Sequence, residues 1–363
     1  MSGIGTGIVA SSEVAAEYAI GFQHVIGQKL AVEHLQNAIR TGRVSQAYLI
    51  HGEKGSGKLA LAQAFAAALV CEHPVEQDGL LEPCGTCHSC HQMATGSHPD
   101  VILATAERAG VTTKTKTLGV QLSRFIQSDV AIKPYEGDWK IYIIPEADRL
   151  NQQAQNALLK TLEEPPAYAV FLLLTDNLSA FLPTILSRCV TLQLHPAREE
   201  ELVTFLEQCG VEHSRAVLDA RLSHGNPGRC TALEEEELRG YRERLEDFLE
   251  RLKGANSHQI VVFAGETAGG GKEELPSHME DLLDFGRSWY RDILVMKSTG
   301  NAASLIFQDR IKYISNIAMQ LSYEGLEQIQ LAFDEAARRL QSKENETQVA
   351  ELLLLAIRRA LRG

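Results

Sequence analysis

The sequence lacks a long apolar run, and this absence argues against a membrane-spanning helix. No run reaches the roughly 18 residues that a membrane-spanning helix needs. Residues 1–21 lack the basic start of a secretion signal and carry Glu13 and Glu17. We therefore expect a flexible leader there, with no signal peptide and no membrane partner.

Positive charge is also scarce, since the formal net charge is −12. This excess of acidic groups argues against a surface that binds nucleic acid throughout. A local basic patch remains compatible with it, because net charge does not report how charges are distributed.

Cysteine is present in an odd number, seven, in a chain without a signal. This usage indicates a reducing compartment, and we predict a cytoplasmic protein. The spacing Cys71-x12-Cys84-x2-Cys87-x2-Cys90 gathers four thiols and favours a metal over disulfides. Four thiolates suit tetrahedral Zn²⁺ and leave no open position for water, so the predicted zinc is structural. The alternatives are His73, His88 and His91 as ligands, an iron–sulfur cluster, or free thiols in a loop.

The length of 363 residues, with 44% hydrophobic and 23% charged residues, indicates an ordinary globular protein of two or three domains. Apolar stretches and helical periodicities alternate up to about residue 196, which predicts an open parallel sheet flanked by helices. The predicted strands are 47–51, 101–104, 139–144 and 170–174, and the predicted helices are 59–70, 118–130 and 151–163.

Beyond residue 196 the patterns are almost entirely helical, and the only strand-like piece is 260–263. We predict a leader at 1–21, an α/β core at 22–196 with a Cys₄ zinc module at 71–90, a small helical domain at 197–236, and an all-α domain at 237–363. The predicted helices are 198–208, 214–222, 227–235, 238–252, 274–296, 305–321, 325–341 and 347–361.

A phosphate-binding loop follows the first predicted strand. Gly52, Gly55, Gly57 and Lys58 have the required glycine and lysine spacing, between a strand and a helix. Backbone N–H groups of such a loop can hold phosphates at a helix N-terminus. The residue after the lysine, which normally supplies a hydroxyl to Mg²⁺, is Leu59.

The second metal-holding position is also missing. The strand 141–144 runs into Pro145, where a metal-binding aspartate would stand, and Glu146 follows it. Glu146 lies where a water-polarising base is expected, but it has no metal-bound phosphate to act on. We predict that ATP or ADP binding is weak or absent, and we favour a loop that is kept because the fold needs its turn over one that holds nucleotide.

Two further motifs carry a family resemblance. The stretch 156–166, Asn-Ala-Leu-Leu-Lys-Thr-Leu-Glu-Glu-Pro-Pro, and Leu186-Ser187-Arg188-Cys189 together are highly specific. With Gln46–Gly52 and the cysteine cluster, they make the chain resemble the delta-prime subunits of bacterial DNA polymerase III clamp loaders, which are AAA+ relatives. Leu59 and Pro145 depart from the related motor subunits.

The resemblance implies a role for each matching position. Arg188, flanked by Ser187 and Cys189, would act in trans on ATP held by a neighbouring motor subunit. Thr175 and Arg229 lie where AAA+ proteins contact nucleotide. The all-α domain would be a collar and 197–236 a lid. The implied partners are the motor subunits, the delta subunit, the sliding clamp and primed DNA.

Each interpretation has a rival. Arg188 alone could cap the C-terminus of the preceding helix. An ATP-hydrolysing motor subunit is the alternative function, and Leu59 and Pro145 argue against it. A zinc module that contacts DNA directly is a third hypothesis. The stretch 71–90 argues against that one, because it contains four acidic residues and no lysine or arginine.

Overall fold

The computed structural model describes residues 21–105, 107–108, 119–232, 236–269 and 277–362. The predicted leader lies outside these residues except for Gly21. The chain divides into two compact units, Met1–His213 with His224–Arg229, and Ser214–Ser223 with Cys230–Gly363. The predicted boundaries of the lid and collar stay predictions.

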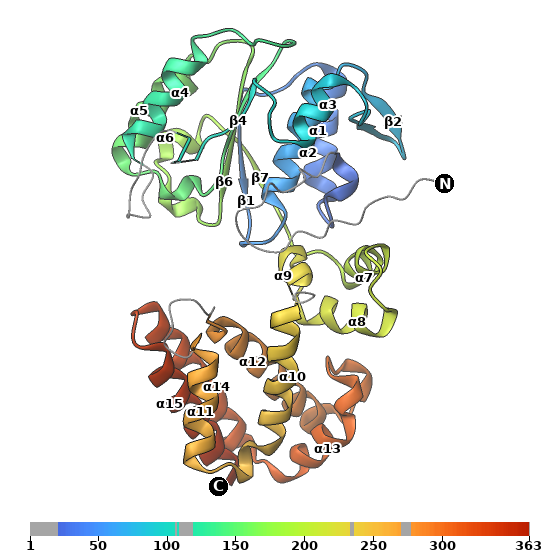
Figure 1. The fold of residues 1–363 in the computed structure, drawn as a ribbon, viewed down its shortest axis with the longest axis vertical. Coiled ribbons are helices and arrows are strands. Elements are labelled where there is room, and N and C mark those ends of the chain that lie inside the picture. Colours follow the sequence, from blue (N-terminus) through green and yellow to red (C-terminus); the bar gives the residue numbers. More distant parts are fainter. Residues whose placement is uncertain (1–20, 106, 109–118, 233–235, 270–276, 363) are drawn as a thin grey trace. The chain divides into compact units, whose positions relative to one another are not determined.

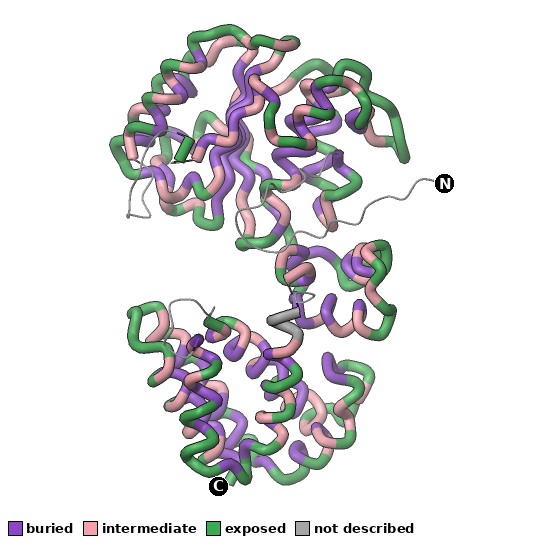
Figure 2. Tube along the Cα trace, in the orientation of Figure 1, coloured by how far each residue is buried: buried purple, intermediate pink, exposed green. Residues whose placement is uncertain are grey.

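A five-stranded parallel sheet forms the centre of the first unit, in the order β4-β5-β6-β1-β7. Every residue of β5 and β6 is buried, because helices cover both faces, and Figure 2 shows these strands in purple. The predicted parallel α/β core is confirmed. The strands are β1 Ala47–His51, β4 Val101–Leu103, β5 Lys140–Ile144, β6 Ala169–Thr175 and β7 Val190–Gln193.

Two hydrophobic cores fill the spaces between the sheet and its helices. Leu35, Phe65 and Ile143 belong to one core, and Leu49 and Leu158 belong to the other. Helices α1, α2 and α3 lie on one face, and α4, α5 and α6 lie on the opposite face (Figure 1). The helices of this unit are α1 Lys29–Thr41, α2 Lys58–Val70, α3 His88–Ala94, α4 Val120–Val130, α5 Gln152–Glu163, α6 Pro183–Leu186 and α7 Glu199–Gln208.

A β-hairpin at residues 75–82 lies between Cys71 and Cys84, where we predicted no strand. Strand β2 is Val75–Gln77 and strand β3 is Leu80–Glu82. The connecting Asp78 and Gly79 both have positive φ, 51° and 77°, as a two-residue Asp-Gly hairpin turn requires.

The hairpin is fastened to helix α1. Gln36 donates from Nε2 to the Leu81 carbonyl at 3.0 Å, and its Oε1 accepts from the Leu81 N–H at 2.7 Å. The carboxylate of Glu82 accepts the backbone N–H groups of Phe22 and Gln23. The insertion is therefore part of the core domain's packed structure.

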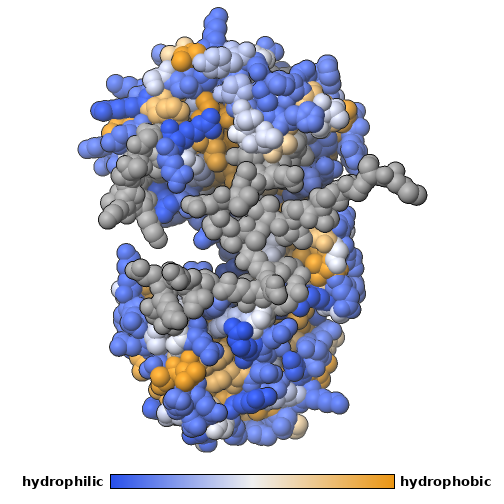
Figure 3. Space-filling view, in the orientation of Figure 1, coloured by the Kyte–Doolittle hydropathy of each residue, from blue (hydrophilic) through white to orange (hydrophobic). Residues whose placement is uncertain are grey.

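Helices make up the second unit. Trp289 and Leu354 are fully buried in its core. Of the coloured surface in Figure 3, most is hydrophilic and the apolar residues form separate patches. From α8 onward the helices are α8 His213–Leu222, α9 Pro227–Ala232, α10 Glu236–Arg251, α11 Ser257–Thr267, α12 Met279–Thr299, α13 Ile311–Gln320, α14 Tyr323–Gln341 and α15 Glu346–Arg362.

The strand predicted at 260–263 is wrong, since these residues lie inside α11. A capping box begins this helix: the Asn256 side chain accepts the Gln259 N–H, and the Gln259 side chain accepts the Asn256 N–H, both at 2.9 Å. Ile260 and Phe263 then face the core, while Val261 and Val262 are exposed. Packing on one helix face overrides the β-propensity of these residues.

Candidate functional site

The phosphate-type loop joins β1 to α2, as predicted. Gly55 and Gly57 have φ of 87° and 90°, which side-chain-bearing residues adopt rarely, and Gly57 is the N-cap of α2. The loop stands at the carboxyl edge of the parallel sheet, where ligands of open α/β folds bind. The loop geometry of a nucleotide site is therefore present.

Lys58 is engaged by its own chain. Its Nζ lies 2.8 Å from the Gly52 carbonyl oxygen, 2.7 Å from that of Glu53, and 2.6 Å from Oδ1 of Asp176. Only 11% of the lysine side chain is exposed. Asp176, which follows β6, was not among the predicted site residues. It supplies the negative charge that a phosphate would otherwise bring.

A second segment of the same unit closes on the loop. Asn226 Nδ2 donates to the Lys54 carbonyl at 2.7 Å, and the Gly228 N–H donates to the Gly55 carbonyl at 2.8 Å. A Cβ at Gly228 would stand 2.7 Å from the Gly55 Cα, so only glycine fits this approach. The backbone N–H of Arg229 donates to Asn226 Oδ1 at 3.1 Å. The backbone of Arg229 thus lies near the loop, and its contact with nucleotide stays a prediction.

The positions that would hold a metal offer no ligand oxygen. Leu59 is 39% exposed at the start of α2, and Pro145 follows the last residue of β5. Glu146, in the left-handed region at φ 49°, forms an exposed ion pair with Arg149. Glu146 is therefore a solvated carboxylate, 62% exposed, in an ion pair on the surface.

Thr175 is buried at the end of β6, and its polar groups bond within the chain. Its Oγ1 lies 3.1 Å from Asp148 Oδ1 and 3.1 Å from the Asn177 carbonyl oxygen, and it accepts the Asn177 N–H at 2.9 Å. Its carbonyl accepts the Gly52 N–H at 3.2 Å. Thr175 therefore ties β6 to the phosphate-type loop.

Arg188 follows α6 on the same unit and is held at two points. Its Nη1 donates to the Thr184 carbonyl at 2.8 Å, which is the helix-capping contact that was the rival interpretation. Its Nη2 lies 2.7 Å from Oε1 of Glu163, the last residue of α5. The side chain remains 34% exposed. Capping and presentation to another chain are therefore compatible.

The two neighbours of Arg188 have structural roles. Ser187 donates from Oγ to the Thr184 carbonyl at 3.1 Å. Burial raises the pKa of the Cys189 thiol to about 11, so it stays protonated and unreactive near neutral pH. This agrees with a packed residue rather than a nucleophile.

The four predicted thiols converge. Their sulfurs all lie within 4.8 Å of one another, and three of the pairs are 3.6, 3.9 and 4.0 Å apart. Tetrahedral Zn–S bonds of about 2.3 Å separate the sulfurs by about 3.8 Å, so the spacing fits such an ion. Among the described residues, the cluster includes none of the three nearby histidines. Its members are Cys71, Cys84, Cys87 and Cys90.

Backbone geometry prepares these sulfurs to be acceptors. The N–H groups of Cys84, Cys87 and Cys90 point to the sulfurs of Cys71, Cys84 and Cys87 at 3.2, 3.3 and 3.4 Å. Gly85, at φ 72°, makes the turn between them. Hydrogen bonds from Thr86 lower the pKa of Cys84 to about 6. Burial raises the pKa of Cys71 and of Cys90, so these two thiols need a nearby cation to ionise.

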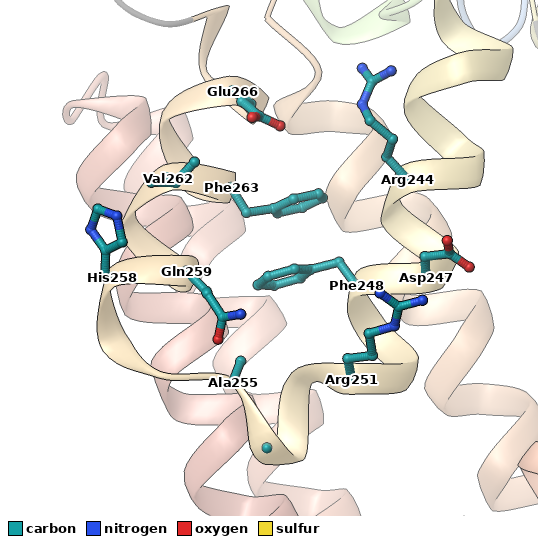
Figure 4. Close-up of a pocket in the computed structure, with 11 residues that line it drawn as sticks. Arg244, Asp247, Phe248, Arg251, Ala255, His258, Gln259, Val262, Phe263 and Glu266 are labelled. Carbon is teal, nitrogen blue, oxygen red and sulfur yellow. The ribbon is translucent and has the colours of Figure 1, made fainter.

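A groove lies in the helical unit, and none of its lining residues is a predicted site residue. It encloses about 700 Å³ between α10 and α11. Phe248 and Phe263 point toward each other across it, as Figure 4 shows, and stack with centroids 4.1 Å apart. Arg244 and Glu266 lie along its rim.

Within the described residues, no helix is long and apolar enough to cross a membrane.

Comparisons with known proteins show which families the chain resembles. The family described as DNA polymerase III, delta subunit, matches residues 27–198. DNA polymerase III subunit delta' of Bacillus subtilis is 30% identical over 91% of this chain and 96% of its own length. Subunit tau of Bacillus subtilis is 31% identical over 88% of this chain but only 54% of its own length. A gamma subunit-related protein of Thermotoga maritima aligns with 90% of this chain and 99% of its own at TM-score 0.44 and 18% identity.

The parallel sheet with helices on both faces and the phosphate-type loop at its edge define an α/β protein of the P-loop type. Within that class, the similarity over nearly the whole length of both chains is decisive. The chain belongs to the delta-prime family of the DNA polymerase III clamp loader.

Proposed function

We propose that this chain is a non-hydrolysing subunit of its clamp loader. The observation that carries the proposal is the state of Lys58, whose ammonium group is satisfied by two loop carbonyls and Asp176. In addition, the two metal positions are occupied by Leu59 and Pro145, and neither side chain can bind Mg²⁺. Weak nucleotide binding through backbone N–H groups is the most that such a loop allows.

The catalytic contribution that we assign to the chain is made in trans by Arg188. A guanidinium carries a permanent charge and a planar fork of donors that matches a γ-phosphate. Arg188 keeps 34% of its side chain exposed. In the assembled ring it reaches ATP held by a neighbouring motor subunit, and Ser187 and Cys189 shape the turn that presents it.

The remaining assignments follow from the family. The chain works in the cytoplasm with motor subunits and the delta subunit to load the sliding clamp on primed DNA. Residues 197–236 serve as a lid and 237–363 as a collar. Zn²⁺, held by the four cysteines, has a structural role, because four thiolates complete its coordination and leave no site for a substrate.

Nucleotide binding and hydrolysis test the proposal. We would measure both for the isolated chain and for the complex reconstituted with the wild-type or Arg188→Ala chain. The expected result is no turnover by the chain alone and a reduced rate with Arg188→Ala. Turnover by the isolated chain would identify an ATP-hydrolysing motor subunit instead.

Metal analysis of protein purified without chelators tests the zinc assignment. We expect one zinc per chain, because the sulfur separations match one tetrahedral ion. Cys90→Ser should lose the metal and unfold at a lower temperature, because metal binding is coupled to folding. Cys209→Ser, outside the cluster, is the control. Iron in place of zinc, or no metal, would contradict the assignment.

A further inference from the structure

Glu163 and Arg188 come from the two most distinctive motifs of the sequence, and the structure brings them together. Glu163 is the last residue of α5, and Arg188 follows α6. Their side chains meet at 2.7 Å, between Oε1 and Nη2. The function assigned to Arg188 leaves Glu163 without a role.

The end of α5 is a firm support for this carboxylate. Directly after Glu163 and Glu164, the carbonyls of Pro165 and Pro166 accept hydrogen bonds from Gln46 Nε2 at 3.3 and 3.1 Å. Gln46 immediately precedes β1 in the sheet. Glu163 therefore stands on backbone that is fixed to the domain's core.

The contacts of Arg188 restrain the guanidinium but leave some of its N–H donors without a hydrogen-bond partner. Nη1 donates to the Thr184 carbonyl and lies 3.5 Å from Ser187 Oγ, and Nη2 pairs with Glu163, so both terminal nitrogens are held and the plane of the group is defined. Among the described residues, Nε makes no hydrogen bond, and the side chain remains partly exposed. Donors are left for a phosphate that approaches from solvent.

The ion pair is also weak enough to yield. Glu163 is 48% exposed and Arg188 34%. Pairs exposed to this degree contribute little net free energy, since water screens the attraction. A phosphate bound by the fork of a guanidinium forms stronger, charge-assisted bonds. The carboxylate can therefore orient the arginine without holding it back from a stronger anion.

We propose that Glu163 is a positioning residue for Arg188. It holds the guanidinium in one plane at the surface, so that less side-chain freedom is lost when the arginine meets a neighbour's γ-phosphate. This inference rests on the proposed trans function of Arg188 and adds the group that prepares it.

Three single variants test the inference in the reconstituted complex. Glu163→Ala should lower kcat for ATP hydrolysis at the neighbouring site on the order of fivefold, with KM little changed, because an unrestrained arginine must be ordered in the transition state. Glu163→Gln keeps an oxygen acceptor and should retain most of the rate. Glu164→Ala removes an adjacent exposed carboxylate and should have no effect.

The decisive readout is the combination with Arg188→Ala. If Glu163 acts through the arginine, Glu163→Ala should change nothing further in the Arg188→Ala complex. An equal drop in both backgrounds, an unchanged rate, or a faster rate with Glu163→Ala would overturn the inference. An unaltered rate with Arg188→Ala alone would overturn the proposed function itself, and the inference with it. Complex formation and the unfolding temperature of each variant exclude misfolding as the cause.

Discussion

Two basic side chains of the α/β unit, Lys58 and Arg188, each pair with a carboxylate, yet their surroundings differ. Lys58 is 11% exposed and contacts two carbonyl oxygens besides Asp176. Arg188 is 34% exposed and keeps part of its fork toward solvent. A cation that normally binds phosphate has become internal, while a cation at another edge of the domain remains accessible. This difference supports the proposal that the subunit acts on a neighbour's nucleotide and not on one of its own.

The largest effect should come from removing the accessible cation. Arg188→Ala should slow hydrolysis at the adjoining motor site on the order of 10³-fold, the loss typical of a missing arginine finger. Arg188→Lys keeps the charge but lacks the planar fork and should recover only a small part of the rate. Single-turnover hydrolysis in the reconstituted complex measures both. A lysine variant with the wild-type rate would show that charge alone suffices.

Removing the internal cation should give the opposite pattern. Lys58→Ala leaves the Gly52 and Glu53 carbonyls and Asp176 without their shared partner, so the free energy of unfolding should fall by about 1–3 kcal/mol. ATP hydrolysis by the complex should stay unchanged. Urea unfolding measures the predicted loss of stability, and steady-state ATPase assays measure the hydrolysis rate.

Lys54→Ala is the matched control for this variant. Lys54 is an exposed lysine of the same loop, and only its carbonyl is bonded, to Asn226. It should leave both stability and rate unchanged. A loss of ATPase activity with Lys58→Ala at wild-type stability would mean that this loop does bind nucleotide in the working complex.

The smallest effect should be a pH dependence of stability that comes from His51, near Lys58. Partial burial first, then His195 and Lys58, lower the pKa of His51, at the end of β1. The unfolded chain therefore binds a proton more readily than the folded one as the pH falls below about 6.5. The His51 contribution to stability is present above that pH and is lost below it, as the pH falls towards the lowered folded pKa.

His51→Gln should accordingly flatten the acid side of the stability curve between about pH 6.5 and 5. Urea midpoints at several pH values measure this. Arg188→Ala leaves His51 and its neighbours in place and should not change the slope. An unchanged slope in His51→Gln would assign the acid sensitivity to other histidines, such as the buried His98, whose pKa burial also lowers.

The places where the sequence misled us have local causes. Four consecutive apolar residues, 260–263, look like a strand, but the Asn256 and Gln259 capping box was a readable signal for α11. Asp78-Gly79 was likewise a readable hairpin signal in a stretch where we predicted no strand. In both cases short-range turn and cap chemistry was more informative than hydrophobicity.

Long-range partners could not be predicted in the same way. Asp176 is 118 residues from Lys58, Glu163 is 25 from Arg188, and Asn226 is 172 from Lys54. The local sequence around each of these residues does not predict its partner. The pairing depends on which distant segments the fold brings together.

By itself, the sequence determined the parallel α/β core, the glycine loop, the missing metal ligands at Leu59 and Pro145, and the four-thiol cluster. These follow from spacing and residue chemistry, which are local properties. Tertiary structure alone decided that Lys58 is neutralised by Asp176 while Arg188, braced by Glu163, keeps donors at the surface. Burial and the convergence of distant segments set the availability of a charge, and a linear pattern contains neither.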